Sequence, residues 1–133
     1  MTAIPNLGYQ FIHWQGVNDE ISTFPTISFD ISTDTTIIAV FEQLNQAPVI
    51  GEIEDQSIDE DQSLEIVISF TDVNETDTVT FSALSSENEL TINFSDDTLK
   101  VNPSENWYGS ASVIIFASDG ELYDTTSFLL NVN

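Results

Sequence analysis

Two clusters of acidic residues lie at the ends of one stretch of this sequence, residues 63–71. They are Asp59-Glu60-Asp61 on one side and Asp72, Glu75 and Asp77 on the other. Neighbouring carboxylates repel one another unless a cation joins them, and the chain has one Lys and no Arg against 23 acidic residues. Hard oxygen ligands on loops suit Ca²⁺, whereas Zn²⁺ would favour His or Cys. The clusters therefore predict metal use, with calcium as the expected ion. The alternative is that these loops are acidic only for solubility.

Side chains between the two clusters alternate as a half-buried strand requires. Leu64, Ile66, Ile68 and Phe70 share one face, and Val67 points the other way. A seven-residue strand spans roughly 23 Å at about 3.3 Å per residue. The two acidic clusters are therefore expected at opposite ends of one domain.

Composition excludes several classes of function. A net charge of −22 excludes nucleic acid as a partner, because phosphate binding needs Lys and Arg. The longest apolar runs, 37–41 and 113–117, are five residues each, so we expect no membrane insertion. Hydrophobic residues make up 41% of the chain, which argues against disorder, and the absence of Cys excludes disulfides. One His, one Lys and no Gly-rich phosphate loop predict that the chain is not an enzyme.

Residues 1–44 are predicted to form a small, truncated β-sheet unit. Alternation begins at Gly8 and loses its period at Trp14, which suggests a bulge near residues 12–13. Strands are expected at 26–32 and 35–42, with a loop at 16–25 between the bulged segment and the first of them. We expect Trp14 in the core of the unit, and His13 at the surface or sheet edge rather than as a ligand or base.

This first unit resembles the C-terminal half of the internalin-type B-repeat, a β-grasp-like module of bacterial surface proteins. The resemblance rests on three motifs: Ala3-Ile4-Pro5-Asn6, Gly8-Tyr9-x-Phe11-x-x-Trp14, and Asp34-Thr35-Thr36-x-x-x-Val40-Phe41. The family's N-terminal hairpin has no counterpart before Met1, so about three strands are expected. Such a small sheet is marginally stable by itself.

Residues 45–133 are predicted to form the second domain, after a linker at 43–48. Short strands separated by polar turns are expected at 49–57 (broken), 63–71, 78–84, 89–94, 98–102, 112–118 and 125–132. Seven strands at this spacing are typical of a Greek-key β-sandwich. The predicted fold class is therefore all-β, a seven-stranded sandwich preceded by the small sheet unit.

The second domain resembles the bacterial cadherin-like (Ig-like) repeat. The matching motifs are Asn45-Gln46-Ala47-Pro48-Val49-Ile50, Asp59-Glu60-Asp61, Phe70-Thr71-Asp72-x-Asn74, Leu99-Lys100-Val101-Asn102-Pro103 and Ala117-Ser118-Asp119-Gly120. The family stacks such domains in long cell-surface or secreted proteins and clamps calcium at the junctions. The resemblance implies these metal ligands: Asp72, Asn74 and Asp119 at one end, and Glu60 and Glu105 at the other. Residues 42–48 have lost a carboxylate of the family's linker motif, so a full multi-ion junction is not expected there.

Two functions from different classes follow. The first is a non-catalytic extracellular module of a longer, repetitive bacterial protein, monomeric, rigidified by weakly bound calcium, and acting as a spacer or adhesion domain. Its partners would be neighbouring domains of the same chain, with a cell-surface protein or glycan as further candidates. The second is a carbohydrate-binding accessory domain of a secreted enzyme, with Trp107 and Tyr108 as a stacking platform. Against the second, an aromatic before the strand at 112–118 commonly plugs a sandwich corner.

Overall fold

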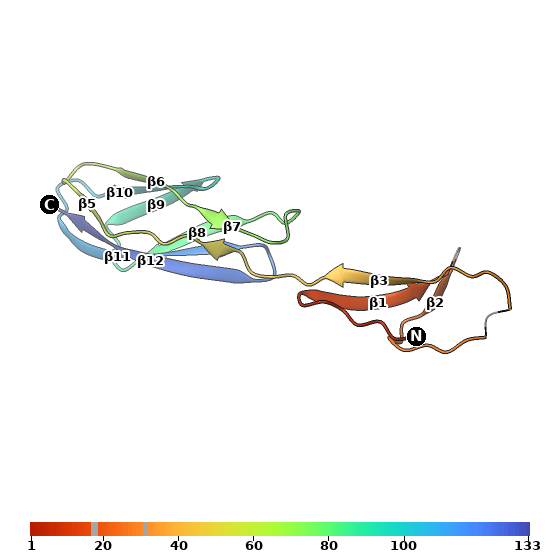
Figure 1. The fold of residues 1–133 in the computed structure, drawn as a ribbon. Helices are drawn as coiled ribbons and strands as arrows, with labels where there is room; N and C mark the ends of the chain where they lie inside the picture. The colour runs from red at the N-terminus through yellow and green to blue at the C-terminus, as the bar shows by residue number, and fades with distance from the viewer. Residues whose placement is uncertain (17–18, 31) are drawn as a thin grey trace. The chain divides into compact units, whose positions relative to one another are not determined.

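The computed structural model describes residues 1–16, 19–30 and 32–133. The described residues form strands, turns and irregular segments, which confirms the all-β prediction (Figure 1). They divide into two compact units, Met1–Asn45 (unit 1) and Gln46–Asn133 (unit 2). Among them there is no helix with the length and apolar character needed to cross a membrane.

Unit 1 contains one three-stranded sheet in the order β2-β1-β3. Its strands are β1 (Tyr9–Gln15), β2 (Glu20–Ser22) and β3 (Ile38–Gln43). The register of β1 against β3 shifts between Phe11 and His13, which confirms the predicted bulge. Because the bulge inserts one residue, Phe11 and Trp14 come to the same side, with ring centroids 5.6 Å apart. Trp14 is 4% exposed and belongs to the core, as predicted.

The strand predicted at 26–32 is wrong for the residues that the structure describes. Thr26 forms only an isolated bridge with Thr2, residues 27–30 are not in a strand, and Ile31 lies outside the described residues. The alternation of this segment fits a strand, but its backbone bonds to the N-terminus instead, where Ile27 N donates to Met1 O at 3.0 Å. The strand predicted at 35–42 begins later, at Ile38. Strand β2 lies within the segment that was predicted as a loop. The sequence did not reveal it, because a strand of three residues is too short to show a period of two.

Unit 2 is a sandwich of two main sheets. The first has the order β5-β12-β11-β8, with β5 (Gln56–Ile58), β12 (Tyr123–Val132), β11 (Gly109–Ser118) and β8 (Thr80–Ser85). The second has the order β6-β10-β9, with β6 (Leu64–Val67), β10 (Thr98–Pro103) and β9 (Leu90–Ser95). A further antiparallel pair joins β4 (Val49–Ile50) to β7 (Phe70–Thr71). Strand β5 pairs with β12 in parallel, and the other pairs are antiparallel.

Unit 2 therefore has nine strands where seven were predicted, because two of the predicted strands are each divided. The segment 49–57 leaves the β4–β7 pair after Ile50 and joins the first main sheet as β5. The segment 63–71 breaks at Ile68, whose N–H donates to Asp97 O at 2.8 Å. Gly51 lies at the crossing: its N–H donates to Ser69 O at 2.7 Å, and a Cβ there would collide with the Ser69 hydroxyl. Only glycine permits so close an approach.

The core of unit 2 lies between its two main sheets. Its largest fully buried side chains are Ile68, Leu99, Val101, Val113, Ile115, Leu130 and Pro48. Ile68 is 2% exposed and its neighbour Val67 is 68% exposed, so the predicted facing of residues 64–68 is confirmed. Phe70, which was predicted on the same face, lies beyond the break and is 39% exposed. The core holds the strands in place. The loops at each end of the sandwich lie outside it and can therefore carry polar groups.

Candidate metal site

Three carboxylates converge at the end of unit 2 where its first residues lie. Asp72 directly follows β7, Asp119 directly follows β11, and Asp77 lies in the turn before β8. One oxygen from each of the three lies within 4.8 Å of the others. Asp72 and Asp119 are half-buried, and Asp77 is exposed. Because β7 and β11 end at the same end of the sandwich, two distant parts of the sequence supply one group of candidate ligands.

Backbone hydrogen bonds hold these carboxylates in place. Asp119 Oδ1 accepts from Glu121 N and from Leu122 N, both at 2.7 Å. Asp72 Oδ1 accepts from Asn74 N at 2.8 Å. The second oxygen, Asp72 Oδ2, is buried and has no hydrogen-bond partner among the described residues. A buried carboxylate oxygen without a partner is costly, and a bound cation would remove that cost.

The structure adds contacts for Asn74 and Asp77 that the sequence did not show. Asn74, an expected ligand, accepts a hydrogen bond from Gln46 N through its Oδ1 at 3.1 Å, and so ties the start of unit 2 to this loop. Asp77 was seen as part of an acidic cluster but was not named as a ligand. Its N–H donates to Asn74 O at 2.9 Å, and this turn brings its carboxylate toward Asp72. The available signal was an acidic residue five positions after Asp72 in a polar turn.

The segments that hold Glu60 and Glu105 lie at the other end of unit 2, as their hydrogen bonds show, and the C-terminus lies at that end (Figure 1). Glu60 N donates to Asn133 O at 2.8 Å. The loop that holds Glu105 approaches the Asp59–Asp61 segment, because Asn106 N donates to Asp61 Oδ1 at 2.9 Å. Both glutamates are exposed. No second group of three convergent carboxylates is present among the described residues. The expected ligands therefore lie at two different ends of unit 2: a convergent end, which holds the three carboxylates, and an open end, which holds Glu60 and Glu105.

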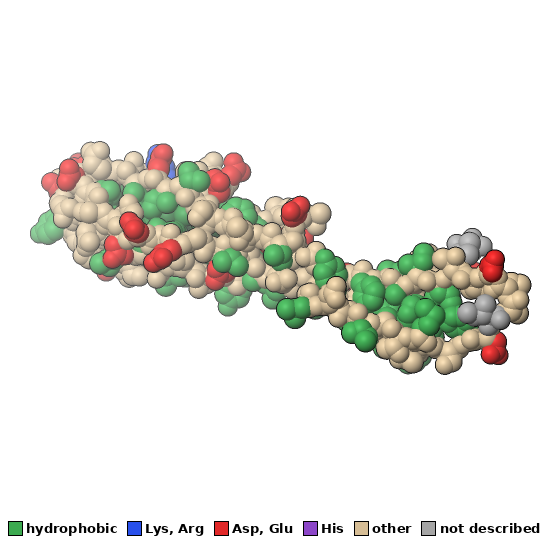
Figure 2. Space-filling model, viewed as in Figure 1, with side chains coloured by type: hydrophobic (Ala, Val, Ile, Leu, Met, Phe, Trp, Pro, Cys, Tyr) green, Lys and Arg blue, Asp and Glu red, His purple; other side chains and the backbone are tan. Residues whose placement is uncertain are grey.

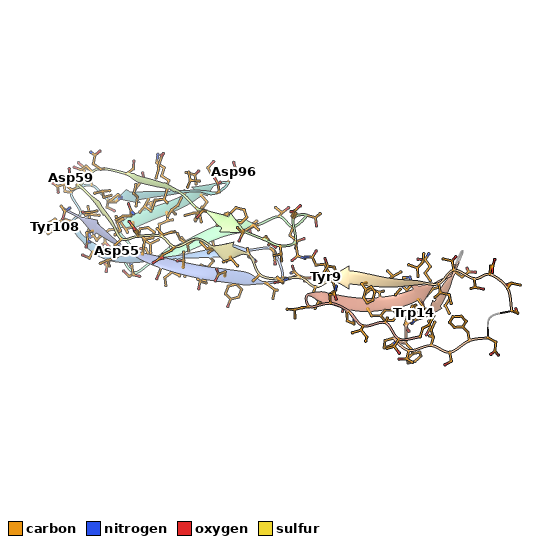
Figure 3. The ribbon with its side chains drawn as sticks, in the orientation of Figure 1. Tyr9, Trp14, Asp55, Asp59, Asp96 and Tyr108 are labelled. Atoms are coloured by element: carbon orange, nitrogen blue, oxygen red, sulfur yellow. The ribbon has the colours of Figure 1, made fainter. Side chains whose placement is uncertain are left out.

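The two aromatic residues before β11 do not share one surface. Trp107 is half-buried and packs against the hydrophobic core. Tyr108 is 75% exposed and projects from the same end of the sandwich as Asp59 (Figure 3). The Trp107 ring also lies over Gly109, where an added Cβ would be 3.2 Å from the ring. Trp107 is therefore placed as a corner plug rather than as an open stacking surface.

His13 lies away from these carboxylates in the sequence and belongs to unit 1. Its Nδ1 is 3.8 Å from Glu20 Oε2 on the neighbouring strand β2, and its side chain is 21% exposed. It therefore takes part in a cross-strand pair of unit 1 and not in the carboxylate group of unit 2.

Comparison with known protein families agrees with this architecture. Residues 45–132 match the family model of the bacterial Ig domain. The chain belongs to the bacterial Ig domain family. Residues 1–45 match the divergent InlB B-repeat domain, so both predicted modules are confirmed in the predicted order. No curated protein matches the chain.

Solved structures similar to this chain have low sequence identity to it. A putative α-galactosidase from Bacteroides fragilis has a TM-score of 0.52 at 10% identity, over 67% of this chain and 18% of the enzyme chain. The endo-fucoidan hydrolase MfFcnA4 has a TM-score of 0.51 at 17% identity, over 99% of this chain and 23% of its own. A chimeric titin Z1Z2 protein has a TM-score of 0.49 at 16% identity, over 68% of this chain and 98% of its own. In both enzymes the similar region is less than a quarter of the chain.

Proposed function

We propose that this chain is a non-catalytic spacer and adhesion module of a longer, repetitive bacterial surface or secreted protein, and that calcium rigidifies unit 2. The observation that carries the proposal is the convergence of Asp72, Asp77 and Asp119, with the buried Asp72 Oδ2 lacking a protein partner among the described residues. Two different modules in series, a B-repeat and an Ig domain, support a place in an extended array. Its partners would be neighbouring domains, and the chain would act as a monomer.

The chemistry of the group suits calcium better than the alternatives. All three groups offer hard carboxylate oxygens, and they lie on loops that can be completed by carbonyl groups and water to the six to eight ligands that calcium takes. Magnesium requires a tighter octahedral arrangement, and zinc favours His or Cys. Partly exposed loops of this kind give weak sites, with dissociation constants on the order of 10⁻⁴–10⁻³ M for extracellular modules.

A bound ion would act on two loops of unit 2, one of which holds the start of the unit. Asp72 lies two residues before Asn74, whose side chain holds Gln46 N. The same ion would join this loop to the Asp119 loop, which closes the β11–β12 hairpin. Rigidity would therefore be gained at the point where the chain enters the sandwich, as a spacer requires. Members of the bacterial Ig family are typically non-catalytic, which fits a mechanical role.

The test is thermal unfolding of the whole chain with calcium or magnesium at constant, high ionic strength. A site that binds only the folded state adds RT ln(1 + [Ca²⁺]/Kd), about 1 kcal/mol at millimolar calcium for a weak site. High ionic strength is needed because any salt relieves repulsion between exposed carboxylates. We expect a rise in Tm that is specific to calcium and confined to the transition of unit 2.

Matched variants separate a site from a charged surface. Asp77→Asn is the sharpest change, because the turn uses the backbone N–H of Asp77 and not its carboxylate. Asp77→Asn and Asp119→Asn should remove the calcium-induced rise, and Glu105→Gln at the open end should keep it. Equal effects of calcium and magnesium that survive Asp77→Asn would show that the acidic loops are only a solvated surface.

A further inference from the structure

Strand β8 is an open edge of the first main sheet of unit 2. It pairs with β11 on one side, and no strand of the described residues pairs with its other side. The pairing with β11 is regular from Thr80 to Ser85, without a bulge. Backbone N–H and C=O groups along the other side of β8 can therefore accept a further strand.

The burial of the inward side chains shows the same opening. The register places Ile115 opposite Ala83, and Ala117 opposite Phe81. Ile115 and Ala117 on β11 are both 0% exposed. Ala83 and Phe81 pack against the same core but are only half-buried. The core thus reaches β8 without being covered beyond it, and one more strand would complete the burial of this row.

Strand β8 lacks the features that usually protect an edge. Edge strands are commonly blocked by charged residues, by Pro, by a bulge or by being very short. The six residues of β8, TFSALS, include no charged residue and no Pro. The other edges of the two main sheets differ, because β5 has three residues, β6 carries Glu65, and β9 runs into Asp96 and Asp97.

The outer face of the sheet beside this edge is also uncharged. The outward positions of β8, β11 and β12 hold only Ser, Thr, Asn, Tyr and apolar residues, although the chain has 23 acidic residues. Leu84 is 62% exposed and lies opposite Ile114 in the register. A strand added to β8 would therefore meet apolar and hydroxyl side chains. This favours a partner strand whose central residues are uncharged.

Carboxylates appear where β8 ends, and they restrict the partner further. Glu87 and Glu89 lie between β8 and β9, and Asp77 lies three residues before Thr80. If two copies of β8 paired antiparallel about Ser82, Glu87 of each copy would approach Asp77 of the other. Like charges opposite each other in a strand pair are destabilising, and each copy has a net charge of −22. A second copy is therefore a poor partner, and a strand with Lys or Arg facing Glu87 and Glu89 is a good one.

We propose that the free edge of β8 binds an extended segment of another protein by strand addition, antiparallel to β8. The segment has about six uncharged residues, the length of β8, in which apolar and small polar side chains alternate. Lys or Arg precedes these residues, because the start of an antiparallel partner lies beside Glu87 and Glu89. This chain has one Lys and no Arg, so its own sequence offers no such segment. The contact goes beyond the proposed spacer role and does not require calcium.

The test is nuclear magnetic resonance of the ¹⁵N-labelled whole chain in EDTA. The probe is the acetylated and amidated peptide KRTVSVTVS, and the comparisons are EETVSVTVS and KRTVPVPVS. The two Pro residues of the last peptide remove N–H donors and prevent strand addition. We expect the first peptide to shift backbone amide signals of residues 80–87, with no comparable shifts from the other two. Because EDTA removes calcium, this proposal and the proposed metal site can fail independently.

Variants assign the contact to the β8 edge. Ser82→Lys adds a charge in the middle of β8 and should weaken binding of the first peptide about tenfold. Thr91→Lys makes the same change of charge at an exposed position of β9 and should leave binding nearly unchanged.

A second set of variants examines the acidic end of the edge. Glu87→Gln combined with Glu89→Gln should weaken binding roughly fivefold, and it keeps the backbone bond from Ser104 N to Glu89 O. Glu105→Gln, at the open end of unit 2, is the matched control.

Three results would overturn the proposal. The first is that the KR peptide shifts no signals of β8, and the second is that the EE peptide shifts them equally. The third is that Thr91→Lys weakens binding as much as Ser82→Lys. Dimerisation of the free chain with shifts at residues 80–87 would make a second copy the occupant of the edge, and it would overturn the proposal as well.

Discussion

The two units of this chain differ in how many apolar side chains they bury, because unit 1 has one sheet and unit 2 has two main sheets that face each other. Unit 2 places two sheets face to face and buries a cluster of 12 hydrophobic residues between them. In unit 1, the buried hydrophobic residues among those described are Ala3 and Trp14. Several large apolar side chains of unit 1 are exposed to solvent. The exposed fraction is 80% for Ile4, 101% for Leu7 and 73% for Phe24. Figure 2 shows green side chains open to view over the strands of unit 1.

The difference follows from layers rather than from composition. A sheet is hydrophobic on one face and needs a second layer to cover it. In unit 1, three aromatic side chains cover one face of the sheet. The Phe11 ring contacts the Trp14 ring, and its centroid lies 5.9 Å from that of Phe41. Trp14 also contributes a cost, because its Nε1 is buried without a hydrogen-bond partner among the described residues. Trp14 is therefore the one large side chain buried among the described residues of unit 1, whereas unit 2 buries many.

The largest expected effect is that of removing this side chain from unit 1. Trp14→Ala should cost about 3–5 kcal/mol, the range for truncating a buried Trp, which is more than a small three-stranded sheet can lose. Unit 1 should unfold while unit 2 keeps its dispersed amide signals in a ¹⁵N spectrum. Trp14→Phe is the control, since it keeps a ring and removes the unsatisfied N–H. Loss of both sets of signals in Trp14→Ala would show that the units do not differ in this way.

The second prediction examines how unit 2 distributes its core. Ile68→Ala should lower the free energy of unfolding by about 2–5 kcal/mol, because it leaves a cavity. Val67→Ala, one position away and 68% exposed, should change it by no more than about 0.5 kcal/mol. Chemical denaturation of both variants checks the pair. A larger loss in Val67→Ala would mean that β6 faces the other way.

A smaller effect is expected at the corner of unit 2. Trp107 is only half-buried against the core, so Trp107→Ala should cost about 2–3 kcal/mol, less than a fully buried Trp. Tyr108→Ala should be nearly neutral, because its side chain is 75% exposed. Thermal unfolding without any sugar makes the measurement. If Trp107→Ala left Tm unchanged and abolished glycan binding, the residue would be a platform rather than a plug.

The smallest effect is expected on the outer face of the β6-β10-β9 sheet, at the pair of Lys100 and Glu65. The hydrogen bond from Lys100 lowers the pKa of the Glu65 carboxyl in the folded state. Its contribution is therefore present above the unfolded pKa of Glu65, and it is lost as the pH falls through the folded pKa. Lys100→Met should raise the pKa of Glu65. Carboxyl ¹³C shifts recorded as a function of pH measure this change. Because the group is exposed, the unfolding midpoint at neutral pH should not change measurably. A large stability loss would show that the pair is structural.

Much of the architecture could be read from short-range patterns. Alternation identified the facing of residues 64–68, and its loss at Trp14 identified the bulge, because both depend only on which side successive residues take. The positions of two candidate ligands were also evident, since Asp72 and Asp119 each directly follow a strand. Family motifs then placed both modules in order.

The sequence by itself determined the strand faces, the core residues and the acidic chemistry of the loops, because these are local properties of the chain. The tertiary structure decided which segments pair and which side chains meet. Residues 26–30 alternate as a strand does, but their hydrogen bonds go to residues 1–3. Asp77 joins Asp72 and Asp119 only when a turn and two distant strands are assembled. Lys100 likewise meets Glu65 only when β6 and β10 lie side by side. Pairing and convergence depend on contacts across the chain, and no local pattern contains them.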